Sequence, residues 1–209
     1  MEEQKLICNP PKKVLAMYGA VIDLINEGCD INTLKVADIT TRAGIGKGTA
    51  YEYFSSKEEI ISSSILFHMQ KCVEELKEIT KSEKSFHEKI DSIMDFIDKH
   101  VHEKQGVFFL IKIIMESYEI PKKMQDEYER IRHRCCEKER NEILDSIVAD
   151  GVREGLVREE NVFLRRAAVE TQLSVYFIYR IAAEKKLEID LESDFLREYV
   201  YRNLLKLLG

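Results

Sequence analysis

The residues best suited to chemistry lie between Leu34 and Glu59, where lysine, hydroxyl and tyrosine side chains follow a glycine-containing turn. Lysines can neutralise phosphate, hydroxyls can donate to phosphate oxygens, and a glycine lets a helix approach its ligand closely. This combination suits contact with a polyanion. The expected contact residues are Lys47, Gly48, Thr49, Tyr51 and Tyr53.

A short helix with one apolar face is predicted just before these residues. Its apolar side chains recur at helical spacing, so the helix must pack against another element. Gly44 and Gly46 then flank Ile45, and we expect both glycines to adopt positive φ so that the chain turns sharply. A second short helix follows from about Lys47 to Phe54. The apolar face of the first helix consists of Val36, Ile39 and Ala43.

This order of elements predicts a helix–turn–helix, whose second helix enters the major groove of DNA. The pattern by itself also fits an ordinary pair of packed helices, because such pairs are common. The segment GIGKGTAYEYFSSKEE is more specific, since it resembles the DNA-binding segment of the TetR family of bacterial transcriptional regulators. In that family a glycine turn, Lys-Gly-Thr, two nearby aromatics, Phe and a helix start of Ser or Asn, Lys, and Glu or Asp occur in the same order.

The resemblance implies that Lys57 contacts phosphate from the start of the following helix. Lys35 departs from the family pattern, because a Thr or Ser often stands there and caps the helix with its hydroxyl. A lysine can supply charge to a phosphate but cannot accept the cap hydrogen bond. We therefore expect Lys35 and Lys57 to contact DNA together with the second helix.

The composition fits a small helical protein. The 209 residues include only three prolines and nine glycines, which favours long helices. The net charge of −6 argues against a nonspecific nucleic-acid coat, but residues 35–57 carry four basic residues against two acidic ones. The expected fold class is all-α, with an N-terminal three-helix helix-turn-helix DNA-binding domain followed by a helical ligand-binding and dimerisation domain.

Capping patterns and apolar stripes place these two domains at residues 1–57 and 58–209. The first helix should begin near Asn9, ahead of two prolines, and end at Gly28. Two capping-box patterns, Ser56 with Glu59 and Ser85 with Glu88, each predict the start of a helix. Further helices are expected from Ser56 to about Lys81, from Ser85, from Pro121 to about Val152, from Asn161 to Lys186 and from Asp190 to Leu208.

The last two predicted helices carry apolar residues on more than one face. A thick monomer core would account for this, but a two-fold symmetric operator requires two DNA-binding domains on one particle. The resemblance implies that the two C-terminal helices of each subunit form the four-helix interface of a homodimer. The expected interface residues are Phe177, Ile178, Tyr199, Leu204 and Leu205.

The resemblance also implies a cavity for a small apolar or amphipathic effector in the second domain. For any one candidate residue, a place in a filled core is the alternative. An effector that presses on Met69 or Cys72 should tilt the helix that begins at Ser56 and alter the spacing of the two DNA-binding domains. The candidate lining residues are methionines and aromatic side chains: Met69, Met94, Phe108, Phe109, Met115, Tyr118, Tyr128, Tyr176 and Phe177.

No arrangement of residues predicts catalysis. His133, Cys135 and Cys136 lie close together in one predicted helix, but adjacent cysteines diverge around a helix and two ligands do not make a zinc site. The sequence has no glycine-rich phosphate loop and no nucleophile elbow. We therefore expect no catalytic residues, no metal and no cofactor.

The five cysteines show no paired spacing, the Met-Glu-Glu start is unlike a signal peptide, and no charge-free run of about 18 residues could span a bilayer. We expect a reduced, cytoplasmic protein with no membrane association. The resulting interpretation is a ligand-responsive, homodimeric transcriptional regulator, a repressor that binds double-stranded operator DNA. The alternative is a helical DNA-architectural or protein-interaction module without a small-molecule switch.

Overall fold

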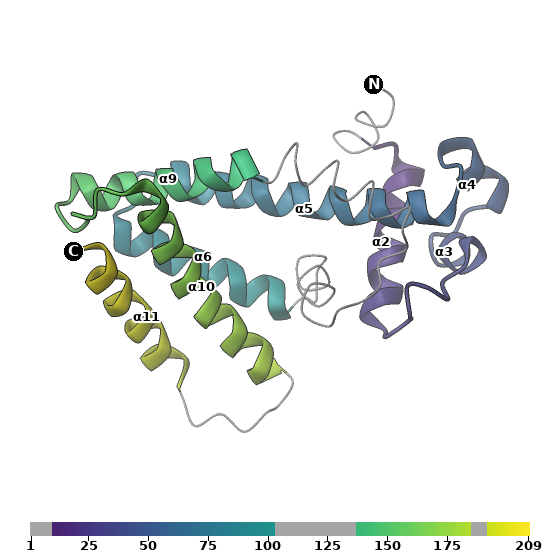
Figure 1. The fold of residues 1–209 in the computed structure, drawn as a ribbon. Coiled ribbons are helices and arrows are strands. Elements are labelled where there is room, and N and C mark those ends of the chain that lie inside the picture. The colour runs from purple at the N-terminus through teal and green to yellow at the C-terminus, as the bar shows by residue number, and fades with distance from the viewer. Residues whose placement is uncertain (1–9, 103–136, 185–191) are drawn as a thin grey trace. The chain divides into compact units, whose positions relative to one another are not determined.

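The computed structural model describes residues 10–102, 137–184 and 192–209, and in these ranges the chain is helical with no strand (Figure 1). The all-α prediction is therefore confirmed. Within the same ranges, no helix combines the length and the apolarity needed to cross a membrane. The chain separates into two compact units. We call residues 10–72 the head, and residues 73–102, 137–184 and 192–209 the body.

The head contains α2 (Lys12–Asn26), α3 (Val36–Arg42), α4 (Lys47–Tyr53) and the first part of α5 (Lys57–Lys81). The first helix begins one residue after Pro11, and its predicted apolar stripe is buried at Val14, Tyr18 and Val21. Asn9, the predicted start, lies outside the described residues. As predicted, the helix ends before Gly28, which adopts a positive φ of 91°.

The helix α5 runs through the boundary between the two units, which falls between Cys72 and Val73. Its start follows the predicted capping pattern, because the Ser56 hydroxyl accepts a hydrogen bond of 3.2 Å from the Glu59 N–H. The Glu59 carboxylate reaches one residue further back than a capping box requires. It accepts from the N–H of Ser55 at 2.6 Å.

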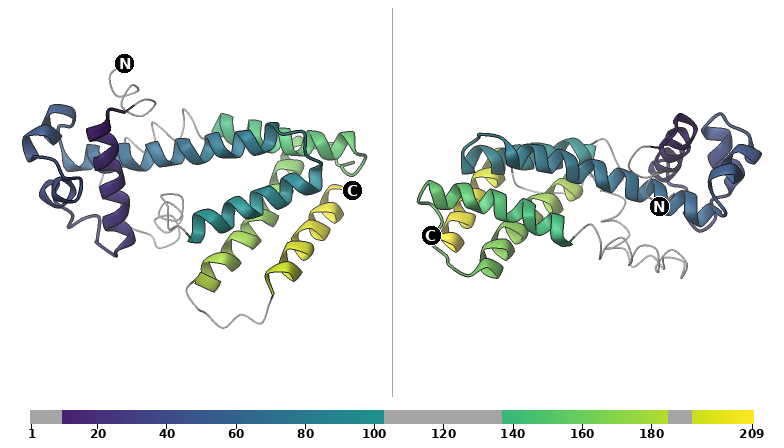
Figure 2. Two further views of the ribbon diagram at one scale, coloured as in Figure 1. Left: turned by 180° about the vertical axis from the view of Figure 1, so that it is seen from behind. Right: turned by 90° about the horizontal axis from the view of Figure 1, so that it is seen from above.

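The body consists of the end of α5 together with α6 (Phe86–His102), α9 (Glu137–Arg153), α10 (Val162–Glu184) and α11 (Ser193–Leu208). The helix α10 packs against α6, α9 and α11, and the views of Figure 2 show α10 and α11 side by side. The predicted capping box at the start of α6 is confirmed, since Ser85 and Glu88 exchange backbone-to-side-chain hydrogen bonds of 2.9 and 3.3 Å.

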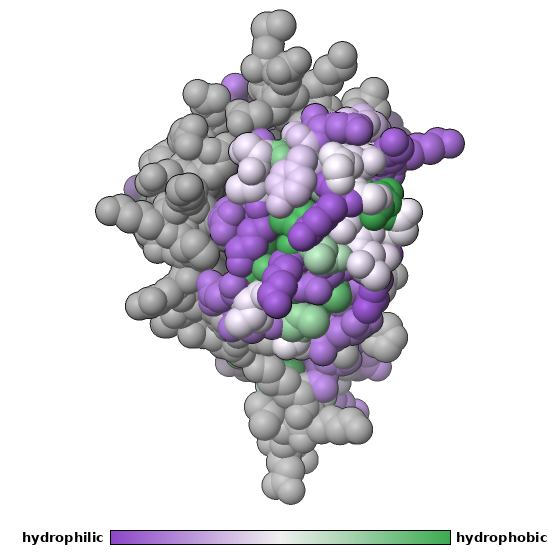
Figure 3. Space-filling model, turned by 90° about the vertical axis from the view of Figure 1, so that its right-hand side faces the viewer, coloured by the Kyte–Doolittle hydropathy of each residue, from purple (hydrophilic) through white to green (hydrophobic). Residues whose placement is uncertain are grey.

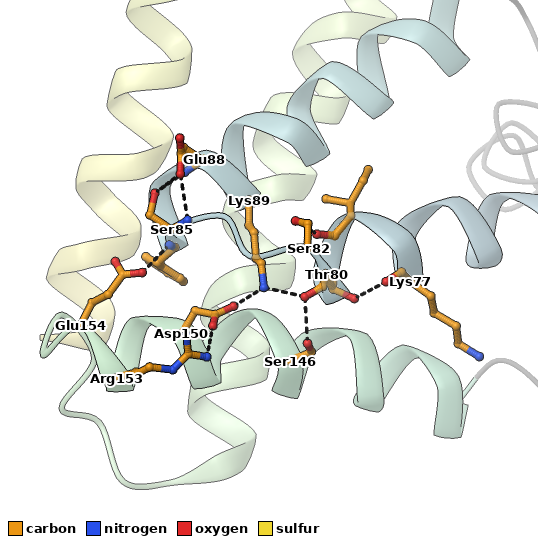
Figure 4. A network of polar contacts seen from close by, with 12 residues as sticks. Lys77, Thr80, Ser82, Ser85, Glu88, Lys89, Ser146, Asp150, Arg153 and Glu154 are labelled. Atoms are coloured by element: carbon orange, nitrogen blue, oxygen red, sulfur yellow. Dashed lines mark hydrogen bonds and ion pairs between the residues drawn. The ribbon is translucent and has the colours of Figure 1, made fainter.

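An ammonium buried in the body joins three helices (Figure 4). Lys89 on α6 pairs with Asp150 on α9, and only 4% of each side chain is exposed. The same ammonium donates to the carbonyl of Thr80 in the last turn of α5. Ser146 on α9 donates to that carbonyl at 3.2 Å. Buried charges are tolerated when they are paired and hydrogen-bonded, and here the pairing also fixes α5, α6 and α9 to one another.

The end of α9 supplies the rest of this junction. Gly151 has no room for a side chain, because a Cβ there would come within 2.6 Å of the Val157 side chain and 3.1 Å of the Phe86 ring at the start of α6. Glu154 then accepts a hydrogen bond of 2.8 Å from the Phe86 N–H, which is otherwise unpaired at the start of α6. The segment DGVREG thus combines a buried carboxylate, a glycine packed directly against two side chains and a cap for a neighbouring helix.

We expect Lys89→Met to lower the free energy of unfolding of the body by about 3 kcal/mol, because Asp150 would keep a buried charge without its main partner. Arg153 also binds Asp150, so the loss should lie at the low end of the usual range. Urea denaturation followed by circular dichroism measures it. The double variant Lys89→Met with Asp150→Leu should recover most of the loss, since both charges are gone.

The matched control is Lys77→Met, which removes a more exposed ion pair to Glu139 of 2.8 Å. It should cost less than about 1 kcal/mol. Equal effects of the two lysine substitutions would show that the buried pair has no special role.

Candidate nucleic-acid interface

The two short helices of the head rest on an apolar core. Each is only seven residues long, too short to be stable alone, so packing must hold it in place. The helix α3 buries Ile39 completely, and α4 buries Ala50 completely, followed by Phe54 at 2% exposure. Tyr18 of α2 lies against the Phe54 ring, with the ring centroids 6.1 Å apart. The core therefore leaves the opposite face of α4 to solvent.

The turn between α3 and α4 follows from one glycine. Gly44 has a φ of 67°, and its N–H and that of Ile45 bond the carbonyls of Thr41 and Thr40 at 3.2 and 3.0 Å. This is the Schellman arrangement that ends a helix with a left-handed residue. The prediction for Gly46 was wrong, because its φ of −76° is extended and it serves as the N-cap of α4. The turn between α3 and α4 therefore contains one left-handed residue, Gly44.

Lys35 is the N-cap residue of α3, and its side chain forms no cap hydrogen bond because an ammonium cannot accept one. The cap comes from the other direction, because Asp38 accepts a hydrogen bond of 2.9 Å from the Lys35 N–H. The Lys35 side chain is exposed. It is therefore available for an anionic ligand.

Arg42 at the end of α3 forms a bidentate pair with Glu27, with N···O distances of 2.7 and 2.5 Å. The hydrogen bonds from Arg42 lower the pKa of Glu27, and those to Glu27 raise the pKa of Arg42. The pair ties the end of α3 to the end of α2. It also neutralises one of the four cations of segment 35–57, so the local charge balance overstates the positive surface.

The solvent face of α4 carries most of the predicted contact residues. Lys47, Gly48 and Tyr51 are exposed, Tyr51 by 56%, whereas Thr49 and Tyr53 are half-buried. Tyr53 also packs against the head core. Figure 3 looks onto the side that carries α3 and α4, and its coloured surface is mostly hydrophilic with small separated apolar patches. A lysine and a tyrosine on such a face can donate to phosphate and to base edges.

Lys57 has partners that the sequence did not indicate. Its ammonium donates to the carbonyls of Asn32 and Leu34, at 2.8 and 3.1 Å. Two of the three N–H groups of this ammonium are thus directed at the loop that precedes α3. The predicted phosphate contact of Lys57 would depend on the third.

The candidate effector residues fall into three groups. Met94 and Tyr176 are completely buried in the apolar core of the body, and the Tyr176 hydroxyl donates to Asp98 at 2.9 Å. Phe177 is half-buried on α10. The side chain of Met69 and the residues Phe108, Phe109, Met115, Tyr118 and Tyr128 lie outside the described parts of the structure, as do His133, Cys135 and Cys136.

The candidate dimer residues separate by exposure. Ile178 and Tyr199 are 52% and 42% exposed, and Phe177 and Leu205 are half-buried. The prediction that Leu204 lies in the dimer interface was wrong, because this side chain is completely buried in the body core of its own chain. Apolar side chains that had not been selected extend the exposed set on α10 and α11: Val162, Phe163, Leu164, Val175, Phe195 and Leu207.

A comparison with protein families finds its match in the same part of the chain as the candidate interface. Residues 30–63 match the family model described as bacterial regulatory proteins, tetR family. This match covers α3, the Gly44 turn, α4 and the first residues of α5. The fatty acid metabolism regulator protein of Bacillus subtilis (strain 168) is 26% identical over 152 residues, which cover 70% of this chain and 72% of that protein.

Two solved structures share the fold over nearly the whole chain. The transcriptional regulator FadR from Bacillus subtilis in complex with stearoyl-CoA has a TM-score of 0.61 and 22% identity, covering 93% of this chain and 97% of its own. The fatty acid degradation regulator FadR from Bacillus halodurans has a TM-score of 0.65 and 18% identity, covering 94% and 95%. This chain therefore shares its fold with these two structures.

The buried Tyr18 should make the head sensitive to alkaline pH. Burial raises the pKa of its hydroxyl to about 12, so the folded head favours the protonated form. This contribution is complete below the unfolded pKa of about 10 and is lost as the pH rises towards 12, a loss of order 2 kcal/mol. Unfolding in urea at a series of alkaline pH values measures it. Tyr18→Phe should remove that part of the alkaline loss, and an unchanged pH dependence in this variant would contradict the assignment.

Proposed function

Because this chain is a transcriptional regulator of the TetR family, we propose that its head binds a two-fold symmetric operator as half of a homodimer and that a small molecule releases it. As a regulator it is not an enzyme, which agrees with the expectation from sequence. The observation that carries the proposal is the geometry of α3, the Gly44 turn and α4. It places Lys47, Gly48 and Tyr51 on one exposed helix face above an apolar core.

In the proposed complex α4 lies in the major groove. Lys47 and Lys35 neutralise phosphates at the groove edges, and Tyr51 donates to phosphate or to a base edge. Gly48 has no atom within 4 Å of an added Cβ, so its small size is needed for no contact inside the head. The lack of a side chain then serves the approach of the DNA backbone. Thr49 and Tyr53 are half-buried on the same helix and remain proposed contacts, and Tyr53 also packs against the head core.

The dimer is proposed to form along α10 and α11. Val175 and Ile178 are 40% and 52% exposed on α10, and Phe195 and Tyr199 are 53% and 42% exposed on α11. The rings of Phe195 and Tyr199 stack with their centroids 6.4 Å apart, which forms a broad apolar surface. Exposed apolar side chains that lie together are typical of an interface. In a two-fold symmetric dimer the same surface of a second copy would cover them.

We propose an effector with a long acyl chain, in the form of a coenzyme A thioester. The support is the name of the Bacillus subtilis relative, a fatty acid metabolism regulator, and the stearoyl-CoA bound in the FadR structure of the same fold. The sequence supplies methionine and aromatic side chains suited to an acyl chain. The proposed lining is the predicted set, in which Met94 and Tyr176 are completely buried in the body core. Its other members are Met69, Phe108, Phe109, Met115, Tyr118, Tyr128 and Phe177.

The helix α5 is the proposed carrier of the signal. It begins in the head at Lys57 and continues without a break to Lys81 in the body. A shift of this helix would change the spacing of two recognition helices that must enter grooves about 34 Å apart. We propose that the protein is a repressor, which the effector releases from the operator, and that it acts in the cytoplasm, where the DNA lies.

The function is tested by selecting duplexes from a random library and then titrating the complex with stearoyl-CoA. We expect a palindromic site to be enriched, and stearoyl-CoA to release it while coenzyme A alone does not. Calorimetry should show that operator weakens acyl-CoA binding by the same factor by which acyl-CoA weakens operator binding. Equal acyl-CoA affinity of the free and bound protein would favour the alternative, a DNA-binding module without a switch. Failure to enrich any site would overturn the proposal.

For the dimer we expect Ile178→Glu to raise the dissociation constant at least about 100-fold, because a carboxylate would be buried in an apolar seam without a partner. Sedimentation velocity at micromolar concentration measures the change. Val152→Glu is the matched control, since Val152 on α9 is 43% exposed and lies outside α10 and α11. A wild type that sediments as a monomer, or equal effects of the two substitutions, would refute this seam.

A further inference from the structure

The loop between α2 and α3 is bound from within by its own polar groups. Asp30 accepts hydrogen bonds from the N–H of Asn32 at 2.9 Å and from its side-chain amide at 3.2 Å. The Thr33 hydroxyl donates to the Asp30 carbonyl at 3.0 Å. Leu34, which follows, is 3% exposed and belongs to the head core. The loop is thus a compact turn that ends at Lys35, the N-cap residue of α3.

Lys57 binds this turn from the first residue of α5. The carbonyls of Asn32 and Leu34 are 25 and 23 residues away in the sequence, and both accept from its ammonium. A hydrogen bond from a charged donor is stronger than one between neutral groups. The Lys57 side chain is half-buried, so water competes with these bonds only in part.

We infer that Lys57 is a positioning residue for DNA binding, and that it acts by holding the Asn32–Leu34 turn and not by contacting phosphate. Its two bonds close the chain segment that contains α3, the Gly44 turn and α4. Because α3 starts directly after this turn, the position of α4 on the head depends on the turn staying in place. The inference rests on the proposed operator binding for its functional consequence.

The geometry distinguishes this role from a phosphate contact. An ammonium that neutralises a phosphate releases a counterion, so its removal lowers the salt slope of binding by about 0.9. In the inferred role the Lys57 ammonium stays directed at the two carbonyls and contacts no phosphate, so it releases no counterion. Removing it should weaken binding through a less ordered head and leave the slope as it was. Lys47, which is exposed on α4, is the lysine expected to change the slope.

The test compares Lys57→Met with Lys47→Met in the full-length dimer. Lys57→Met keeps an unbranched apolar stem but has no donor. We expect it to lower operator affinity about tenfold with an unchanged salt slope, and to speed amide hydrogen exchange in residues 32–36. Lys47→Met should lower the slope by about 0.9 and leave that exchange unchanged. Lys57→Arg, which retains donors and charge, should restore most of the affinity and the protection.

The opposite pattern overturns the inference. A slope that falls by about 0.9 in Lys57→Met with unchanged exchange would make Lys57 a phosphate contact, and unchanged affinity would leave it without a role in binding. The exchange measurement needs no DNA, so it tests the bonds to the turn even if no operator is found, in which case the proposed function fails separately. If Lys57→Met does not fold, the same exchange measurement compares Lys57→Arg with Lys57→Gln. Equally low protection of the amides of residues 32–36 in both variants would refute the inference.

Discussion

The buried ammonium of Lys89 is the interaction on which the architecture of the body depends. Its carboxylate partner Asp150 and its carbonyl partner Thr80 lie on different helices, so one charge holds the last turn of α5, the start of α6 and the end of α9. An apolar contact tolerates a small rotation of either helix. A buried ammonium does not, because any rotation that removes a partner leaves a charge in a medium of low dielectric constant.

The head is held together by different means. Its helices α3 and α4 are too short to fold alone, and they depend on the apolar core around Tyr18, Ile39 and Phe54. Two polar contacts stabilise the edges of this core. The ion pair of Arg42 connects the end of α3 to the end of α2, and the hydrogen bonds of Lys57 connect the start of α5 to the loop before α3. Among the described residues, none forms a hydrogen bond or ion pair with the side chain of Lys47 or Tyr51 on the exposed face of α4, and both are exposed to a ligand.

The helix α5 takes part in the polar contacts of both units. In the head the first residue of α5 donates to two carbonyls, and in the body the carbonyl of Thr80 near its last residue accepts from Lys89. In the proposed function, a movement of α5 caused by an effector must therefore carry the loop before α3 with it. The ties at the two ends give the helix a firm connection to each unit, and the proposed switch requires such a connection.

The sequence by itself determined the features that depend on local chemistry. The spacing of Val14, Tyr18 and Val21, the capping box of Ser85 and Glu88, and the glycine turn between α3 and α4 all followed from residues within a few positions of one another. The order of residues in the Gly44–Glu59 segment likewise indicated the family. Even here Gly46 was assigned the wrong backbone conformation, because a turn that needs one left-handed residue does not indicate which of two glycines supplies it.

Only the tertiary structure decided which distant residues meet and which apolar faces the chain covers itself. Lys57 and Leu34 are 23 residues apart, and Lys89 and Asp150 are 61 apart, so no helical period relates them. Leu204 and Ile178 are both apolar residues on C-terminal helices, yet Leu204 is completely buried and Ile178 is 52% exposed. Periodicity shows that a helix has apolar faces. Whether the same chain, a ligand or a second copy covers each face depends on how the helices pack, and that is a property of the whole fold.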